Sequence, residues 1–411
     1  MLIKSIKNQK NLLQYIALSY FDKAIIFLLP LLAFHFFKDQ QVYVSIEYIY
    51  SVTTVIVPLI DLGLSGYFFY AYRDSENQEK VLKDFLNTFQ RLYLLVSFIG
   101  LCLIAINYYI FGFEEFIVFI VSRLLFVLAS VFLSSYYRLI NRPKMAVYIT
   151  LVSNFLSLIF LLGYFFADLE FSLWLIFIGQ ILFSVFYILK CITAIFFTEN
   201  EKINSNQIKN IIRKTLLYSW PTILHAFTTM YIVNYGKINA LSKMTVDDGV
   251  LLSLIQRLAM IIFLTHSSIL AYLIKEIYVD NDLLSINKNI LFKYIRFLTV
   301  ALLIVSFLAV LYLTFGFDGE NSIRAITVTC LIIAQTFFAC IVAYLESHYG
   351  RENKNIITLY LALFGAVVFI LILTFLKVDF LLRVSIAMFF STLASFLASV
   401  FVLKSRNYKM V

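Results

Sequence analysis

Seven ionisable side chains of this 411-residue chain lie inside long apolar runs, where a charged side chain is energetically costly. They are four bases and three acids: Lys23, Arg123, Lys237, Arg257, Asp22, Glu47 and Asp61. A charged residue at the centre of a lipid-facing helix costs about 2.5–3.5 kcal/mol. We therefore expect these side chains to face a bundle interior or a watered cavity. Arginine binds phosphate oxygens bidentately and keeps its charge, so the basic majority predicts a central cavity that binds an anion such as a diphosphate through Arg123, Arg257, Lys23 and Lys237.

The acids suit a different task. Asp61 lies in "VIVPLIDLGLSGYFFYAYRD", where Pro58 and Gly63 predict a kinked or loosened helix. A carboxylate beside such a break can bind and release a proton or a sodium ion, so we predict that Asp61, with Asp22 and Glu47, serves ion coupling or gating. A second kink is predicted at Pro221 in "YSWPTILHAF". The alternative is structural: Asp61 pairs with a lysine or arginine, and the whole set of deep charges pairs as contacts between helices.

The surroundings of these residues are those of a membrane protein. Hydrophobic residues make up 62% of the chain, charged residues 14%, and the mean hydropathy is +0.90. Runs of about 20 apolar residues cross a hydrocarbon core of roughly 30 Å. We predict an all-α integral membrane protein with twelve spans, near 12–36, 42–72, 86–111, 115–137, 145–167, 171–197, 214–242, 247–274, 290–315, 323–346, 355–376 and 379–403.

The distribution of lysine and arginine predicts the orientation. If the N-terminus is cytoplasmic, the cytoplasmic segments hold 21 of these residues and the opposite side holds three, Lys38, Lys243 and Lys377. Such a bias is the positive-inside signal, and it places both termini in the cytoplasm. Five further bases lie close enough to a span end to extend to the interface: Arg91, Lys190, Arg296, Arg324 and Arg383.

The most polar connection divides the chain near its midpoint. Residues 198–213 are predicted to be a cytoplasmic linker between an N-terminal lobe of six helices, 1–197, and a C-terminal lobe of six helices, 214–411. "VYVSI" from Val42 matches "VLLSL" from Val250, and Arg142 matches Arg351 at nearly the same offset. These matches favour two parallel repeats with a substrate path between them. A bundle of twelve helices without a repeat is the alternative.

Other kinds of site are not predicted. The four histidines are far apart, so no metal site is expected. The chain has no phosphate-binding Walker loop, and we expect no cofactor and no nucleic-acid partner. Lone polar residues such as Asn154, Gln180 and Gln335 are predicted to make hydrogen bonds between helices.

Two motifs carry a resemblance to a known family. "PLIDLGLSGYFFYAYR" contains an Asp-Leu-Gly-Leu step from Asp61 to Leu64, followed by the basic Arg73, and "INRPK" forms a basic turn after the fourth span. With the twelve spans, short loops and midpoint linker, the chain resembles bacterial O-antigen flippases of the Wzx type. These form part of the polysaccharide-exporter branch of the multidrug/oligosaccharidyl-lipid/polysaccharide (MOP) flippase superfamily, whose fold is MATE-like.

The resemblance implies a function. It implies a flippase of the bacterial inner membrane that moves an undecaprenyl-diphosphate-linked oligosaccharide from the cytoplasmic to the periplasmic leaflet. It further implies alternating access, coupling to H⁺ or Na⁺, and work alongside a polysaccharide polymerase and chain-length proteins. Of the candidate site residues, only Asp61 lies on a family-like motif. The others are proposed from depth and charge.

Two rival functions remain open. A MATE-like multidrug or cation antiporter shares the fold, but we expect its cavity to be richer in acids than in bases. A membrane-embedded polysaccharide polymerase or ligase needs a sizeable outer loop, whereas the outer connections here, such as "KDQQ" and "FGFEE", are short. We therefore expect a transporter rather than an enzyme.

Overall fold

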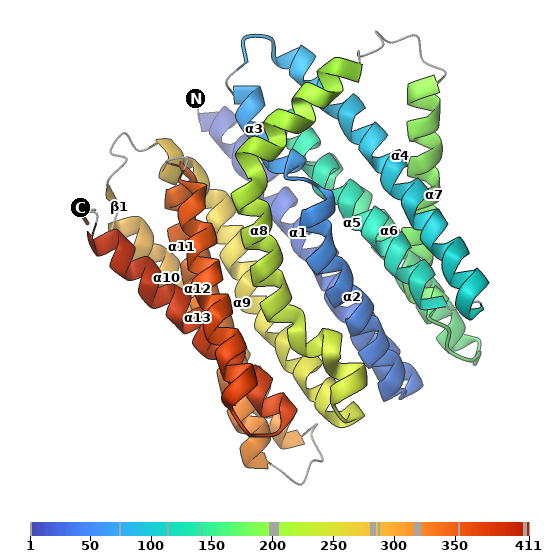
Figure 1. The fold of residues 1–411 in the computed structure, drawn as a ribbon, viewed down its shortest axis with the longest axis vertical. Helices are drawn as coiled ribbons and strands as arrows, with labels where there is room; N and C mark the ends of the chain where they lie inside the picture. Colours follow the sequence, from blue (N-terminus) through green and yellow to red (C-terminus); the bar gives the residue numbers. More distant parts are fainter. Residues whose placement is uncertain are drawn as a thin grey trace. The chain divides into compact units, whose positions relative to one another are not determined.

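The chain is almost entirely helical. The computed structural model describes residues 2–73, 75–112, 115–140, 142–196, 205–279, 285–286, 288–315, 322–351, 354–405 and 409–410. In these ranges lie thirteen helices and two short strands (Figure 1): α1 (Leu2–Phe37), α2 (Gln40–Ile60), α3 (Leu64–Arg73), α4 (Gln78–Phe111), α5 (Glu115–Leu139), α6 (Pro143–Phe166), α7 (Trp174–Phe196), α8 (Ser205–Lys243), α9 (Val246–Val279), β1 (Ser285–Ile286), α10 (Lys288–Phe315), α11 (Ser322–Arg351), α12 (Asn355–Phe375), α13 (Phe380–Ser405) and β2 (Lys409–Met410).

Local signals in the sequence account for several helix ends. Asp39 accepts a hydrogen bond from the Val42 backbone N–H at 3.0 Å, and Asn77 accepts one from Lys80 at 3.0 Å, so each satisfies a free N–H in the first turn of its helix. α6 begins at Pro143, whose missing N–H costs nothing there. In unit 2, β1 and β2 pair in parallel.

Two compact units make up the chain. Unit 1 comprises Met1–Ile223 and unit 2 comprises Leu224–Val411. The boundary therefore lies inside α8, two residues after Pro221. Residues 205–213 of the predicted linker form the first turns of α8, and 198–204 lie outside the described residues.

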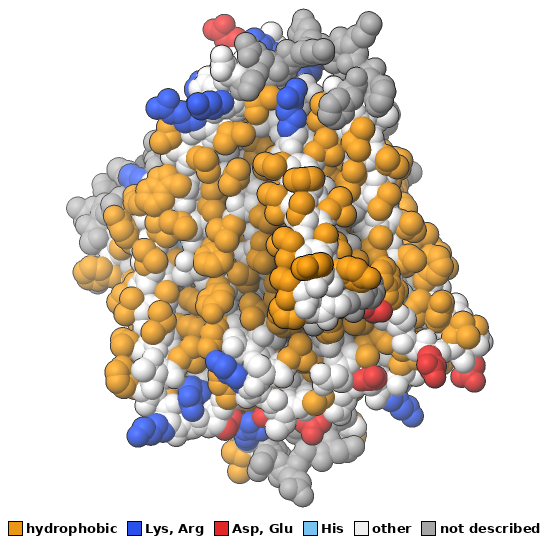
Figure 2. Space-filling model, turned by 45° about the vertical axis from the view of Figure 1, so that its right-hand side comes forward, with side chains coloured by type: hydrophobic (Ala, Val, Ile, Leu, Met, Phe, Trp, Pro, Cys, Tyr) orange, Lys and Arg blue, Asp and Glu red, His pale blue; other side chains and the backbone are white. Residues whose placement is uncertain are grey.

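Eleven of the described helices are long and apolar enough to cross a membrane. α8, where we predicted the seventh span, has the length but is more polar, and α3 has only 10 residues. On the face drawn in Figure 2, hydrophobic side chains cover the middle, and most lysines, arginines and acids lie toward two ends. In a bilayer every backbone N–H and C=O must be satisfied within the chain, which favours these continuous helices. The protein is a multi-pass membrane protein.

Stacked aromatic rings join α3, α4 and α5 in unit 1. Phe68 stacks on Phe85 at 4.7 Å between centroids and on Phe132 at 5.6 Å, and Phe132 stacks on Phe89 at 3.9 Å. All four side chains are buried. Because aromatic rings are rigid and large, this column fixes the short α3 against two long helices.

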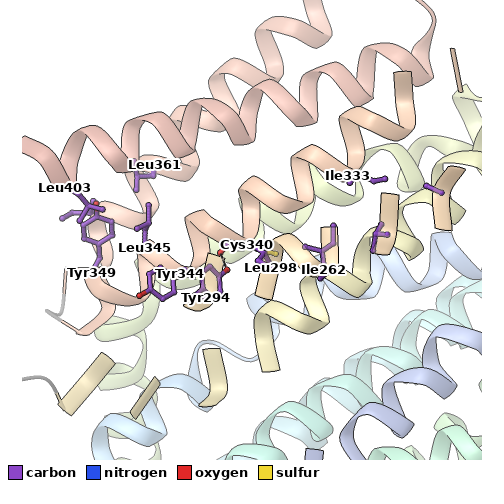
Figure 3. Packing of buried hydrophobic residues seen from close by; sticks show 14 residues of the cluster. Ile262, Tyr294, Leu298, Ile333, Cys340, Tyr344, Leu345, Tyr349, Leu361 and Leu403 are labelled. Atoms are coloured by element: carbon purple, nitrogen blue, oxygen red, sulfur yellow. Dashed lines mark hydrogen bonds between the residues drawn. The ribbon is translucent and has the colours of Figure 1, made fainter. Parts of the chain in front are cut away.

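In unit 2, the core contains a polar chain among apolar side chains. Tyr294 on α10 stacks on Tyr344 of α11 at 4.5 Å, and its hydroxyl donates to the Cys340 carbonyl at 2.8 Å (Figure 3). The same hydroxyl lies 2.7 Å from Nδ1 of His266 on α9, so Nδ1 is the donor of this pair. The tyrosine thereby ties three helices together without leaving its hydroxyl unsatisfied.

Candidate functional site

Asp61 lies at a break between two helices. α2 ends at Ile60, two residues after Pro58, and α3 begins at Leu64. Leu62 and Gly63 between them have positive φ angles of 53° and 71°. The Asp61 carboxylate accepts hydrogen bonds from the Ser65 hydroxyl at 2.7 Å and from the Ser65 backbone N–H at 3.2 Å. Asp61 thus caps the new helix, and the predicted alternative, a pair with a lysine or arginine, is not formed among the described residues.

A close contact with α8 requires glycine at the break. The Ser219 hydroxyl donates to the Gly63 carbonyl at 3.2 Å, and a Cβ atom at Gly63 would overlap the Ser219 Cβ. The left-handed φ of Gly63 also disfavours any other residue. Unit 1 therefore holds the first half of α8 against the start of α3, through residues 156 positions apart in the sequence.

Asp22 is the centre of a second polar site in unit 1. It lies on α1, is 3% exposed, and accepts hydrogen bonds from Thr150 at 2.8 Å and from Asn154 at 2.9 Å, both on α6. Both partners are neutral. A buried carboxylate with neutral oxygen-bearing partners can take up a proton or a small hard cation, because such cations prefer oxygen ligands.

Arg123 connects three helices in the same unit. Its guanidinium carbon lies 3.4 Å from the centroid of the Tyr50 ring on α2, and Nη1 donates to Gln180 on α7 at 3.4 Å. Stacking of this kind suits the planar guanidinium. Glu47 lies one turn before Tyr50 on α2 and is 2% exposed. The hydrogen bonds between helices predicted for Asn154 and Gln180 are confirmed, as is that of Gln335, which donates to Thr392 at 3.3 Å.

Lys237 and Arg257 lie on neighbouring helices of unit 2. α8 and α9 pack closely, since Gly236 faces Leu252 and Gln256 donates to the Val233 carbonyl at 3.0 Å. Lys237 follows Gly236 and is 7% exposed, and Arg257 follows Gln256 and is 3% exposed. Arg257 is about 16 Å along α9 from its start at a 1.5 Å rise per residue. Two of the four predicted bases are therefore buried side chains on this helix pair.

Lys23 differs from the other predicted bases because its side chain is exposed on α1, whereas that of Asp22 is buried. Consecutive helical residues point about 100° apart, and here Asp22 points toward α6 while Lys23 does not. Its role in an anion site stays a prediction.

Three of the bases expected to reach the interface are exposed, namely Arg91, Lys190 and Arg296. Arg324 is instead the centre of an ion-pair network in unit 2. It binds Asp248 through two hydrogen bonds of 2.7 and 2.9 Å and Asp379 through one of 2.7 Å, joining the first turns of α9 and α11 to the start of α13. Arg383 donates to the Val378 carbonyl at the same end of α13.

Sequence reasoning missed one titratable pair. His225 on α8 lies 3.0 Å from a carboxylate oxygen of Glu346 on α11, and both side chains are largely buried. No local signal connects two residues 121 positions apart. Ser65, by contrast, stands four residues after Asp61, a spacing from which a helix start is predictable. Within the described residues, no three histidine, cysteine, aspartate or glutamate side chains are placed to hold a metal ion.

Comparison with known proteins identifies the fold. No protein-family model and no curated protein sequence matches the chain. Among solved structures, the MATE multidrug transporter DinF-BH is similar with a TM-score of 0.67 and 14% identity, over 97% of this chain and 96% of that one. The lipid II flippase MurJ, in an inward closed conformation, is similar with a TM-score of 0.61 and 15% identity, over 95% of this chain and 87% of that one.

A third similar structure is that of a MOP superfamily transporter from Pyrococcus furiosus, for which a binding pocket of reverse polarity is described. Its TM-score is 0.51 and its identity 12%, over 96% of this chain and 95% of that one. The similarity extends over nearly the whole chain in each comparison. The expected fold class is confirmed: this is an all-α membrane protein with the fold of MATE transporters and of the lipid II flippase MurJ.

Proposed function

We propose that the protein is a flippase of the bacterial inner membrane for undecaprenyl-diphosphate-linked oligosaccharide, the repeat unit of an O-antigen or similar surface polysaccharide. The observation that carries this proposal is the pair of buried bases on α8 and α9, Lys237 and Arg257. A lipid diphosphate must lose water to cross the bilayer, and buried cationic groups compensate that loss. A fold shared with a lipid II flippase supports the same class of substrate.

The energetics of the proposed reaction are consistent with this arrangement. The isoprenoid tail stays in the bilayer, so only the diphosphate and glycan need a polar path. Outward movement of negative charge from a cell with a negative interior is favourable by about 2.3 kcal/mol per charge per 100 mV. A coupling ion is then needed mainly to return the empty carrier, and Asp22, with its neutral partners Thr150 and Asn154, is the best placed of the three acids to bind one.

A MATE-like multidrug or cation antiporter is the second candidate. It is favoured by the TM-score of 0.67 to a multidrug transporter, against 0.61 to the flippase, and by the three buried acids of unit 1. The buried bases of unit 2 argue against a cationic substrate, because like charges in a low-dielectric interior repel strongly.

The test uses a strain that lacks the protein and is complemented with wild type or Arg257→Ala. Lipid-linked repeat units are quantified on each leaflet, together with surface polysaccharide. We expect units to accumulate on the cytoplasmic leaflet in the deletion strain, to be cleared by wild type and to persist with Arg257→Ala. Accumulation on the periplasmic leaflet would indicate a polymerase or ligase, and unchanged polysaccharide with altered drug resistance would indicate the antiporter.

A further inference from the structure

Three tyrosines gather where α3 meets the first half of α8. Tyr70 stacks on Tyr218 at 4.8 Å between ring centroids, Tyr67 lies 5.3 Å from Tyr218, and Tyr67 and Tyr70 lie 5.9 Å apart with nearly parallel rings. All three side chains are part-exposed and belong to unit 1. We refer to Tyr67, Tyr70 and Tyr218 as the tyrosine platform.

The platform is held rigidly by the elements around the Asp61 break. Tyr67 also contacts Phe85, which is part of the stacked phenylalanine column of unit 1. On the other side, Tyr218 directly precedes Ser219, whose contact with Gly63 fixes α8 against α3. The break therefore lets α8 approach α3 closely enough for Tyr218 to stack on Tyr70.

A basic side chain stands one helical turn from the platform. Lys214 precedes Tyr218 by four residues on α8, so the two share a helix face about 6 Å apart along the axis. Lys214 and its neighbour Arg213 are exposed. The positive-inside pattern places this end of α8 on the cytoplasmic side, where the glycan lipid would be loaded.

Resting on the proposed flippase function, we propose that the tyrosine platform binds a sugar ring of the lipid-linked glycan at loading, with Lys214 beside the diphosphate. One face of a pyranose carries C–H groups of slight positive charge, which pack on the negative face of an aromatic ring. The ring hydroxyls remain free to bond the tyrosine hydroxyls and water. Because a diphosphate is bonded directly to the first sugar, an aromatic surface and a lysine one turn apart match that head group in spacing and charge.

The experiment compares two lipids in nanodiscs that contain the purified protein: undecaprenyl diphosphate and undecaprenyl diphosphate bearing N-acetylglucosamine. Wild type should bind the sugar-bearing lipid more tightly. Tyr218→Leu should lose about 3- to 10-fold in affinity for that lipid and leave the bare lipid unchanged. Tyr218→Phe keeps the ring and should bind both lipids within about twofold of wild type.

The outcomes separate this inference from the proposed function. Equal weakening of both lipids by Tyr218→Leu would show that the tyrosines serve only folding or membrane anchoring, and no change for either would show that they bind no sugar. Either result overturns the platform and leaves the flippase in place. Binding of neither lipid by wild type would overturn the proposed function itself.

Discussion

The two units bury charges of opposite sign. Among the side chains that the structure describes, the buried carboxylates are Asp22, Glu47 and Asp61, all in unit 1, and the buried lysine and arginine are Lys237 and Arg257, both in unit 2. The buried acids and the buried bases thus belong to different units. We interpret the difference as a division of tasks, in which unit 1 binds the coupling cation and unit 2 compensates the anionic substrate.

The largest expected effect comes from the buried base of unit 2. Arg257→Ala should reduce flipping of a lipid diphosphate by roughly 30-fold or more, since removal of a buried charged partner typically costs about 2–5 kcal/mol. Arg257→Lys should flip the lipid at a rate between those of wild type and Arg257→Ala, because lysine keeps the charge but lacks the planar guanidinium group. Flipping is measured in liposomes with a fluorescent lipid diphosphate.

Arg296→Ala is the matched control, because it removes an exposed arginine from the same unit. It should change flipping by less than about twofold. If Arg257→Ala melts at the wild-type temperature and flips at the wild-type rate, the assignment of the substrate to unit 2 fails.

The next effect concerns the break that buries Asp61. Gly63→Ala should destabilise the protein by about 2–4 kcal/mol, because the left-handed conformation disfavours a side chain and the new Cβ meets Ser219. The melting temperature in detergent measures this loss. The double variant Gly63→Ala/Ser219→Gly should regain part of the lost stability, because it lacks the Ser219 side chain that the new Cβ meets.

Gly66→Ala is the control for this pair. A Cβ at Gly66 meets nothing within 4 Å, and the residue lies inside α3, so alanine should stabilise by up to about 1 kcal/mol. Equal effects of the two substitutions would contradict the close contact between α3 and α8.

A smaller effect tests the cation site of unit 1. Asp22→Asn keeps the side-chain shape, so flipping in the absence of an ion gradient should change by at most about tenfold, the range of one or two neutral hydrogen bonds. Stimulation by a proton or sodium gradient should disappear. Glu79→Gln, which neutralises an exposed acid on α4, should retain it. Gradient stimulation that survives Asp22→Asn would remove Asp22 from the coupling mechanism.

The smallest effect concerns charges of unit 2 that are not buried. Burial alone would raise the pKa of the Asp379 carboxyl, but the hydrogen bonds from Arg324 and Leu382 outweigh it and hold the pKa below its usual range. The resulting stability is present above the unfolded pKa of about 3.9 and is lost as the pH falls through the lower folded value.

The contribution should be below about 1 kcal/mol, because the Asp379 side chain is 41% exposed. Melting curves of wild type and Asp379→Asn between pH 7 and pH 3 measure it, since this variant keeps the pair of Arg324 with Asp248. The two proteins should converge in stability at the acidic end. A constant difference across the range would show that the ion pair with Asp379 contributes nothing.

Local patterns were sufficient to predict much of the fold. Apolar runs predicted where the membrane helices lie, because a bilayer leaves the backbone few alternatives to a helix. Most helix ends agree with the prediction within five residues, but α1, α4 and α8 begin eight to ten residues earlier than predicted. The disturbance near Asp61 was predictable from Pro58 and Gly63. The break follows Ile60 because the Asp61 carboxylate accepts hydrogen bonds from Ser65, four residues later, and so caps the start of α3.

Partners far apart in the sequence were not predictable. Arg324 was expected to extend to the membrane interface, yet it binds Asp248 and Asp379, 76 and 55 residues away. Lys23 was expected to face the interior together with Asp22; the Asp22 carboxylate binds Thr150 and Asn154 of α6, and the Lys23 side chain is exposed.

The sequence by itself determined that this chain crosses the membrane many times, that bases and acids must lie deep within it, and that a helix breaks near Asp61. Those properties depend on hydrophobicity and on residues within one helical turn of each other. Only the tertiary structure decided that the buried acids belong to unit 1 and the buried bases to unit 2. It also placed Tyr218 against α3, through a serine and a glycine 156 residues apart. Such contacts depend on how helices pack, and no local pattern encodes which distant side chain will fill the space beside a given residue.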